Sequence, residues 1–371
     1  MYDQIREDTL FIILYSVVTA MAMLASCYLL FRQGNAFAKD VTPPARLRRW
    51  TAAFFAILAL NHVWYMPIFF LSSSEDIMMT DLIGGLLDSM TLFPVAIIVL
   101  LAMLQDRRRP LWPVAAIMAP IVVIAIFCVS TRSYAFLPIV YVYSLLMCIG
   151  LVIYMVHALR QYGRWLRDNY ADLEHKEVWQ SFVVLASMIL VFAVYAFTSE
   201  GPIYQFTMQI IILVLVFYLL WRVETLSDLS LSLQPESQPI DLSIPAKRES
   251  GVSQKVPTAN IGPLLQKYCI DTQLYLQHDL TLSQLAHAIG TNRTYLTKYF
   301  IHQGVTYNAY INDLRISHFV NLYREAAATG SPITAQQLAH DSGYRSYSTF
   351  SLAFKQRMGQ TVTAWMRNPT E

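Results

Sequence analysis

Hydrophobic and polar positions divide the chain into two parts. Up to about Val223 the sequence consists of long apolar runs separated by short charged loops, whereas the later residues are polar at first and then regain a helical period. A helix that crosses a bilayer needs about 20 mostly apolar residues. Seven runs predict such helices, over residues 10–31, 50–71, 82–104, 111–129, 137–159, 178–197 and 203–221.

The C-terminal part shows short amphipathic helices in a repeated arrangement. Apolar residues spaced by three and four, such as Leu285 and Ile289, predict one helix that Gly290 can end in a left-handed cap. Asn292 can then cap a second helix over 293–300. The same order returns about fifty residues later, where Leu338-Ala339 and Gly343 take the places of Leu285-Ala286 and Gly290. This internal repeat predicts two helix-turn-helix units.

This repeat resembles the DNA-binding domain of the AraC/XylS family, over residues 261–367. The residues that carry the resemblance are Leu285-Ala286, Gly290, Tyr295-Leu296, Phe300, Gly304-Val-Thr306, Tyr310-Ile-Asn-Asp-Leu-Arg-Ile316, Ala339, Gly343-Tyr344, Phe350, Phe354-Lys355 and Gly359. The resemblance implies a long connecting helix near 308–325 and two recognition helices that enter successive major grooves of double-stranded DNA.

The resemblance also implies which side chains meet DNA. In the first recognition helix they are Asn292, Arg293, Thr294, Thr297 and Lys298, and in the second they are Arg345, Tyr347, Ser348 and Ser351. Cations and hydroxyl groups of this kind bind phosphates or base edges. The alternative is that these polar residues are the solvated faces of an ordinary helical bundle.

Composition indicates a membrane domain and excludes several other classes of protein. The chain is 55% hydrophobic and only 14% charged, which is too apolar for an ordinary soluble protein. The four cysteines lack the spacing of a zinc or redox motif, and no phosphate-binding loop or catalytic constellation occurs. We therefore expect no enzyme activity, no metal and no cofactor. The predicted domains are a seven-helix membrane bundle (1–224), a flexible linker rich in Ser and Pro (225–260) and a DNA-binding domain (261–371).

Loop charges predict the orientation, because cytoplasmic loops retain lysine and arginine. The loops after the first, third and fifth predicted spans hold twelve cations, and the opposite side holds only Arg6 and Arg132. The N-terminus is therefore expected outside and the C-terminal domain in the cytoplasm, as a multi-pass protein of the bacterial inner membrane. DNA is reachable from that side.

Polar residues inside the predicted spans suggest a sensory site, because such residues are costly in lipid. His62 and Asp88 are expected at similar depth, so we predict that they form a carboxylate-histidine pair. With Asn61 and Tyr65, the pair is hypothesised to line an outward-facing pocket for a small-molecule signal. The alternative is a polar clasp that holds two helices together.

The segment 161–180 mixes aromatic residues with alternating charges and predicts an interfacial cytoplasmic helix, or else an ordinary connecting loop. From Leu264 to Glu371, nine Lys and Arg oppose six Asp and Glu, which predicts weak nonspecific DNA affinity and a reliance on a homodimer or on paired sites.

The expected function is a membrane-bound transcription regulator that couples a signal to gene expression. The alternative is a transporter or passive anchor fused to a DNA-binding domain.

Overall fold

A computed structural model describes residues 9–32, 35–38, 41–132, 135–187, 202–229, 261–329 and 334–367. Within these ranges every regular element is a helix, and β-structure is limited to one isolated bridge. The all-α prediction is therefore confirmed. The chain divides into two compact units: the first comprises Met1–Tyr162 and Val178–Ser230, and the second comprises Gly163–Glu177 and Leu231–Glu371.

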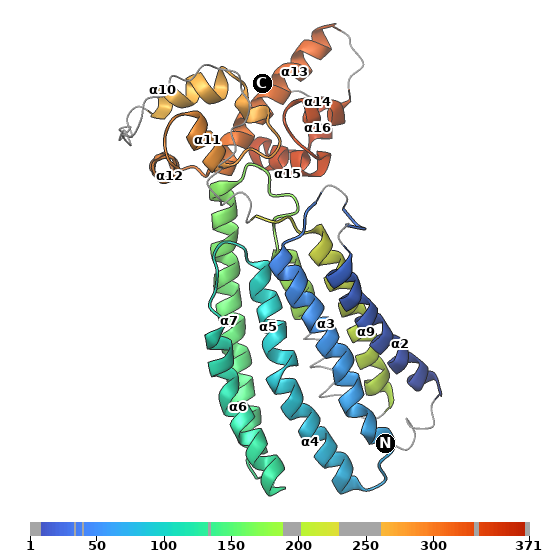
Figure 1. Ribbon diagram of the computed structural model, residues 1–371. Helices are drawn as coiled ribbons and strands as arrows, with labels where there is room; N and C mark the ends of the chain where they lie inside the picture. The colour runs from blue at the N-terminus through green and yellow to red at the C-terminus, as the bar shows by residue number, and fades with distance from the viewer. Residues whose placement is uncertain are drawn as a thin grey trace. The chain divides into compact units, whose positions relative to one another are not determined.

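The first unit is a bundle of long apolar helices that run roughly alongside one another (Figure 1). Its helices are α2 (Thr9–Phe31), α3 (Ala45–Tyr65), α4 (Ser74–Met90), α5 (Leu92–Met103), α6 (Trp112–Thr131), α7 (Leu137–Asn169) and α9 (Pro202–Thr225). Helix α2 packs against α3 and α9, α3 also packs against α5, and α4 packs against α6. The last residues of α7 belong to the second unit.

Six helical segments of the described residues are long and apolar enough to cross a membrane. They are Thr9–Phe31, Ala45–Phe69, Ser74–Met103, Trp112–Thr131, Pro138–Asn169 and Gln205–Thr225. They correspond to six of the seven predicted spans. The remaining one, 178–197, is helical over 179–187, but the rest of it lies outside the described residues. A seventh span therefore stays a prediction.

Prolines shape two of these segments in ways that the apolar pattern alone did not predict. The span expected over 82–104 begins earlier, at Ser74, and is interrupted at Thr91, where φ is −125° and ψ is −64°. Pro94 follows and has no N–H for the carbonyl of Met90, so a regular turn is lost there. Likewise α3 ends at Tyr65 and gives way to a 3₁₀ turn, Met66–Phe69, that contains Pro67.

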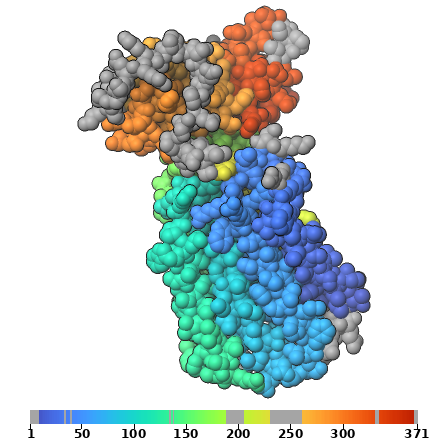
Figure 2. All heavy atoms as spheres, in the orientation of Figure 1, coloured from blue at the N-terminus to red at the C-terminus, as the bar shows by residue number. Residues whose placement is uncertain are grey.

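The outer surface of the first unit is apolar. Leu145, Leu146 and Ile153 of α7 are each more than 60% exposed, and similar side chains are exposed on α2 and α6. Helices α3, α4 and α6 present a continuous surface in the space-filling view (Figure 2). An apolar area of this extent is costly in water and is typical of helix bundles that lipid tails solvate.

The second unit contains α10 (Ile261–Leu265), a π-helical turn (Gln266–Ile270), a 3₁₀ turn (Leu274–Leu276), α11 (Leu282–Ala288), α12 (Arg293–His302), α13 (Tyr307–Thr329), α14 (Ala335–Asp341), α15 (Tyr347–Met358) and α16 (Val362–Arg367). One core lies among α10, α11, α12 and the start of α13. Another lies among the rest of α13, α14, α15 and α16. The long α13 thus joins two small cores, as predicted. The predicted linker lies outside the described residues from residue 230 onward.

Candidate nucleic-acid interface

The first helix-turn-helix consists of α11 and α12, and side-chain caps fix both helix starts. Thr281 and Gln284 form a capping box, in which each side chain accepts a hydrogen bond from the other residue's backbone N–H. Gly290 in the turn has φ of +74°, a left-handed conformation that favours glycine. Asn292 Oδ1 accepts from the Tyr295 N–H at 3.0 Å, so the predicted cap of the recognition helix is confirmed.

The second helix-turn-helix repeats this arrangement with α14 and α15. Thr334 caps α14 by accepting from the Gln337 N–H, and Ser346 caps α15 by accepting from the Thr349 N–H. The turn glycine, Gly343, has φ of +88°. The internal repeat that the sequence predicted is thus present in the backbone as well as in the side-chain caps.

Arg315 of α13 connects the two helix-turn-helix units. Its side chain is 1% exposed, and its guanidinium donates to the carbonyls of Tyr275 (2.8 Å), Gln277 (2.6 Å) and His278 (3.2 Å). The guanidinium also lies 5.4 Å from the centre of the Tyr344 ring. Burial lowers the pKa of Arg315, and nearby hydroxyl and carboxyl groups oppose that shift. This buried arginine therefore holds the two helix-turn-helix units together.

The nine side chains expected to meet DNA are exposed or half-buried on the two recognition helices and their caps. Some already have protein partners. The Thr297 hydroxyl donates to the Arg293 carbonyl at 2.8 Å, and Ser348 bonds the Ser346 hydroxyl at 3.0 Å. Arg345 lies 3.4 Å from the Asp279 carboxylate. Neither core contains any of the nine.

The segment Gly163–Glu177 packs against this DNA-binding region. Tyr170 forms an isolated antiparallel bridge with Thr281, and the Ala171 N–H donates to the Leu280 carbonyl at 3.3 Å. The Asn308 amide at the start of α13 donates to the Ala171 carbonyl at 2.6 Å. Ala171 is 2% exposed and belongs to the first core.

Charged residues of the same segment reach the second helix-turn-helix. The Thr349 hydroxyl near the start of α15 donates to Glu174 Oε2 at 3.1 Å. Lys176 lies 3.6 Å from Asp279, the same carboxylate that pairs with Arg345.

These contacts correct the prediction of one interfacial helix over 161–180. Helix α7 ends at Asn169, and the residues after it have no helix until residue 179. Sequence reasoning missed the roles of Ala171, Glu174 and Asn308, because nothing local distinguishes a segment that meets protein from one that meets lipid headgroups.

Residues 285–368 match a family described as a helix-turn-helix domain. The match covers both recognition helices and agrees with the resemblance to AraC-type regulators. It indicates a DNA-binding transcription regulator. No match was found among curated proteins or among solved structures.

The polar residues proposed as a sensory site lie inside the first unit, but not as the predicted pair. His62 is 2% exposed, with Nδ1 2.8 Å from the Leu58 carbonyl and Nε2 3.0 Å from the Gln209 side chain. Asp88 instead accepts from the Asn61 amide at 2.7 Å and from the Tyr65 hydroxyl at 3.1 Å. The carboxylate-histidine bond was therefore a wrong prediction. Both groups have partners on neighbouring helices, as the alternative of a polar clasp requires.

Proposed function

We propose that this chain is a sequence-specific transcription regulator integrated in a bacterial inner membrane, where it couples a membrane or extracytoplasmic signal to gene expression. The observation that carries the proposal is the pairing of two capped helix-turn-helix units with six helices that are candidates for spanning a bilayer, in one chain. With the seventh span predicted over 178–197, the chain crosses the membrane an odd number of times, so the N-terminus lies outside and the DNA-binding domain lies in the cytoplasm, as the loop charges favour.

DNA recognition is assigned to α12 and α15. Arg293 and Lys298 bind phosphates or guanine from the first helix, and Arg345 binds phosphate from the second once it leaves Asp279. Asn292, Thr294, Thr297, Tyr347, Ser348 and Ser351 complete the contact set. The small surplus of cations favours binding as a homodimer or at paired sites.

Signal detection is assigned to the membrane unit, through the polar cluster of Asn61, His62, Tyr65 and Asp88. The cluster joins α3 to α4 through Asp88 and α3 to α9 through His62 and Gln209. A small-molecule signal that competes for these hydrogen bonds would alter how the three helices pack, because polar bonds inside a span have no water to replace them.

DNA recognition is tested with the full chain in detergent micelles and with duplexes selected by it from a random-sequence pool. We expect Lys298→Ala to weaken binding and to reduce the slope of log affinity against log salt by about one, because one phosphate contact is lost. Lys267→Ala is the matched control, since Lys267 lies over the Tyr268 ring outside the recognition helices. Selection of no preferred duplex would overturn the assignment of DNA recognition.

The membrane assignment has a separate test. A reporter enzyme fused after Glu371 should be active only in the cytoplasm, and the chain should resist extraction by high salt and alkali. Reporter activity on the outer side would contradict the proposed orientation. Substrate flux through the chain in vesicles would instead favour the transporter.

A further inference from the structure

The packing of Gly163–Glu177 on the DNA-binding region has a consequence for regulation. The segment is fixed at three separate points: the Ala171 backbone on Leu280 and Asn308, Lys176 on Asp279, and Glu174 on Thr349. Ala171 is buried in the same core as the first helix-turn-helix. A merely neighbouring loop would not contribute to that core.

The position of Glu174 conflicts with DNA binding by the second recognition helix. Thr349 is the third residue of α15, and recognition helices present their N-terminal residues to the major groove. The first turn of a helix carries a partial positive charge and free N–H groups, which attract an anion such as a DNA phosphate. A carboxylate held at this end satisfies the same attraction and repels the phosphates.

Arg345, a residue assigned to DNA, shares a carboxylate with Lys176 of the segment. Asp279 lies between Lys176 and Arg345, at 3.6 Å and 3.4 Å. The ion pair with Asp279 keeps the Arg345 guanidinium directed toward protein. Because Asp279 does not belong to the segment, this ion pair does not depend on docking, and the competition with DNA is carried by Glu174 at the start of α15.

We propose that the N-terminal end of α15 is a docking surface for the chain's own segment Gly163–Glu177, and that DNA competes with the segment for it. This inference rests on the proposed function. The docked segment follows directly on α7, most of which belongs to the first unit, so a change in that helix reaches DNA affinity through release of the segment. Docking lowers the affinity of the second helix-turn-helix for DNA, and release of the segment restores that affinity.

The proposal is tested by measuring DNA affinity of the full chain in micelles after removal of one charge. Glu174→Gln should raise affinity for the selected duplex by about threefold to tenfold, because the binding-competent population grows. Asn308→Ala should act in the same direction by freeing the Ala171 carbonyl. Glu325→Gln is the matched control, because it removes the same charge from the exposed face of α13 and should change affinity less.

Hydrogen exchange gives an independent readout of the competition. The Ala171 amide is bonded to Leu280, so peptides over 170–176 should exchange slowly in the free chain and faster when duplex is added. Unchanged affinity in Glu174→Gln, or greater protection of 170–176 on DNA, would overturn the proposal. If the unaltered chain prefers no duplex at all, the proposed function fails instead, so the two failures can be told apart.

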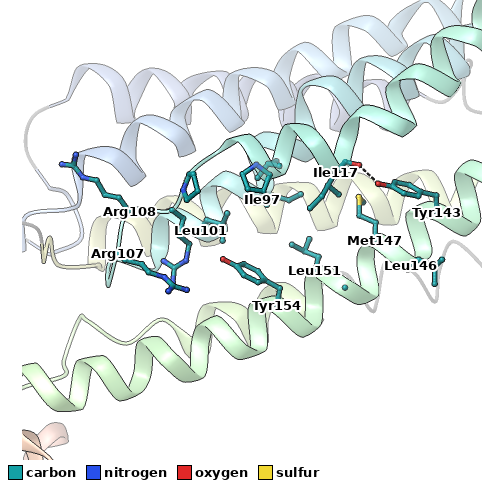
Figure 3. A pocket seen from close by; sticks show the side chains of 15 residues that line it. Ile97, Leu101, Arg107, Arg108, Ile117, Tyr143, Leu146, Met147, Leu151 and Tyr154 are labelled. Carbon is teal, nitrogen blue, oxygen red and sulfur yellow. Dashed lines mark hydrogen bonds between the residues drawn. The ribbon is translucent and has the colours of Figure 1, made fainter.

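A second inference comes from a different place, a groove in the first unit. It has a volume of about 760 Å³ and lies between α5, α6 and α7 (Figure 3). Its walls are apolar, with Ile97, Leu101, Ile117, Met147 and Leu151 among the lining residues. Tyr143 closes α7 against α6 by donating to the Ile117 carbonyl at 2.8 Å.

One end of the groove is cationic. Arg107, Arg108 and Arg109 are among the residues that line it. Figure 3 shows Arg107 near Tyr154 and the Arg108 side chain directed away from that tyrosine. Arg109 is buried against Asp106, at 2.8 Å, and donates to the Leu104 carbonyl. Arg107 is half exposed and lies 3.9 Å from the same carboxylate. Arg107 and Arg108 are both exposed, so each can offer N–H donors to an outside anion.

We propose that this groove binds an anionic phospholipid, with the phosphate at Arg107 and Arg108 and an acyl chain along the apolar walls. The inference rests on the proposed membrane location, which puts these arginines at the cytoplasmic face. Basic sites between membrane helices on that side bind anionic headgroups. A groove with a cationic end and apolar walls suits a ligand with an anionic headgroup and an acyl chain, whereas a free anion would not contact the apolar walls.

The test is binding of fluorescent phosphatidylglycerol to the full chain in micelles, compared with phosphatidylcholine of the same acyl chains. Joint Arg107→Gln and Arg108→Gln substitution should weaken phosphatidylglycerol binding about tenfold or more. Gly150→Leu should also weaken it, because a side chain there enters the groove without a clash. Gly85→Leu is the control, since that glycine is equally unobstructed and does not line the groove.

Two results would overturn the lipid site. One is equal binding of both lipids. The other is displacement of phosphatidylglycerol by inorganic phosphate alone, which would assign the arginines to a free anion. DNA binding by the same variants shows whether the proposed function stands independently of the groove.

Discussion

Gly290 and Gly343 occupy equivalent turns of the two helix-turn-helix units, but their surroundings differ. Both have positive φ, at +74° and +88°, so an L-residue at either position is strained. A Cβ atom at Gly290 would meet no heavy atom within 4 Å. At Gly343 it would lie 2.7 Å from the Leu276 carbonyl oxygen and 2.8 Å from the Leu276 Cα. These are backbone atoms that no rotamer change can move.

The two alanine substitutions therefore separate backbone strain from steric overlap. Gly290→Ala should destabilise its unit by about 1 kcal/mol, the cost of a left-handed alanine. Gly343→Ala carries the same cost and adds an overlap of roughly 1 to 3 kcal/mol, because the loop over Leu274–Leu276 must shift. We expect a total near 3 kcal/mol.

Amide hydrogen exchange of the full chain measures both values in the same molecule. Peptides over α11 and α12 should exchange about five times faster in Gly290→Ala, and peptides over α14 and α15 about a hundred times faster in Gly343→Ala. Since the two glycines have the same role in the turn, each variant is the control for the other. Equal effects would refute the close approach of Gly343 to Leu276.

Three further predictions concern side chains of the DNA-binding region. Arg315→Leu should destabilise this region by about 3 kcal/mol or more, because three carbonyls lose a charged donor, and exchange over 275–278 should show it, with Arg315→Lys intermediate. Burial raises the pKa of Cys269 to about 11, so the free energy of unfolding should fall as pH rises above 9, where only the unfolded thiol ionises. Cys269→Ala should lessen this fall near pH 9 and leave the fall at higher pH, because burial also raises the pKa of Tyr307, Tyr310 and Tyr344. Thr281→Ala should cost about 1 kcal/mol through loss of the capping box, and calorimetric melting of the full chain should register it.

Local sequence patterns were sufficient for most of the helices. Asn292 as a cap and Gly290 and Gly343 as left-handed turns could be predicted from a few neighbouring residues, and the structure confirms them. The long connecting helix was implied by the family resemblance and is also confirmed. Apolar length alone was sufficient for six candidate spans. The break at Thr91 needed one more step, the missing N–H of Pro94 three residues later.

Hydrogen-bond partners that lie far apart in the sequence could not be predicted from the pattern of apolar and polar residues. His62 and Asp88 were expected to bond each other from their depth in the spans, but depth does not specify which helix face each one occupies. In the structure His62 turns to Gln209, which is 147 residues away, and Asp88 turns to Asn61 and Tyr65. Gly84 makes the contact between Tyr65 and Asp88 possible, because the Tyr65 ring lies where a Cβ atom of residue 84 would be.

The segment Gly163–Glu177 shows why sequence-based predictions fail where a residue pattern suits both a membrane surface and a protein surface. Its aromatic and charged residues suit a membrane surface, and the same residues suit a protein surface, because both offer an apolar region beside a polar one. What distinguishes the two is the backbone: Ala171 and Tyr170 bond to Leu280, Thr281 and Asn308, which no lipid headgroup could reproduce in that geometry. A segment whose composition suits both environments is consistent with the release that we propose for Gly163–Glu177.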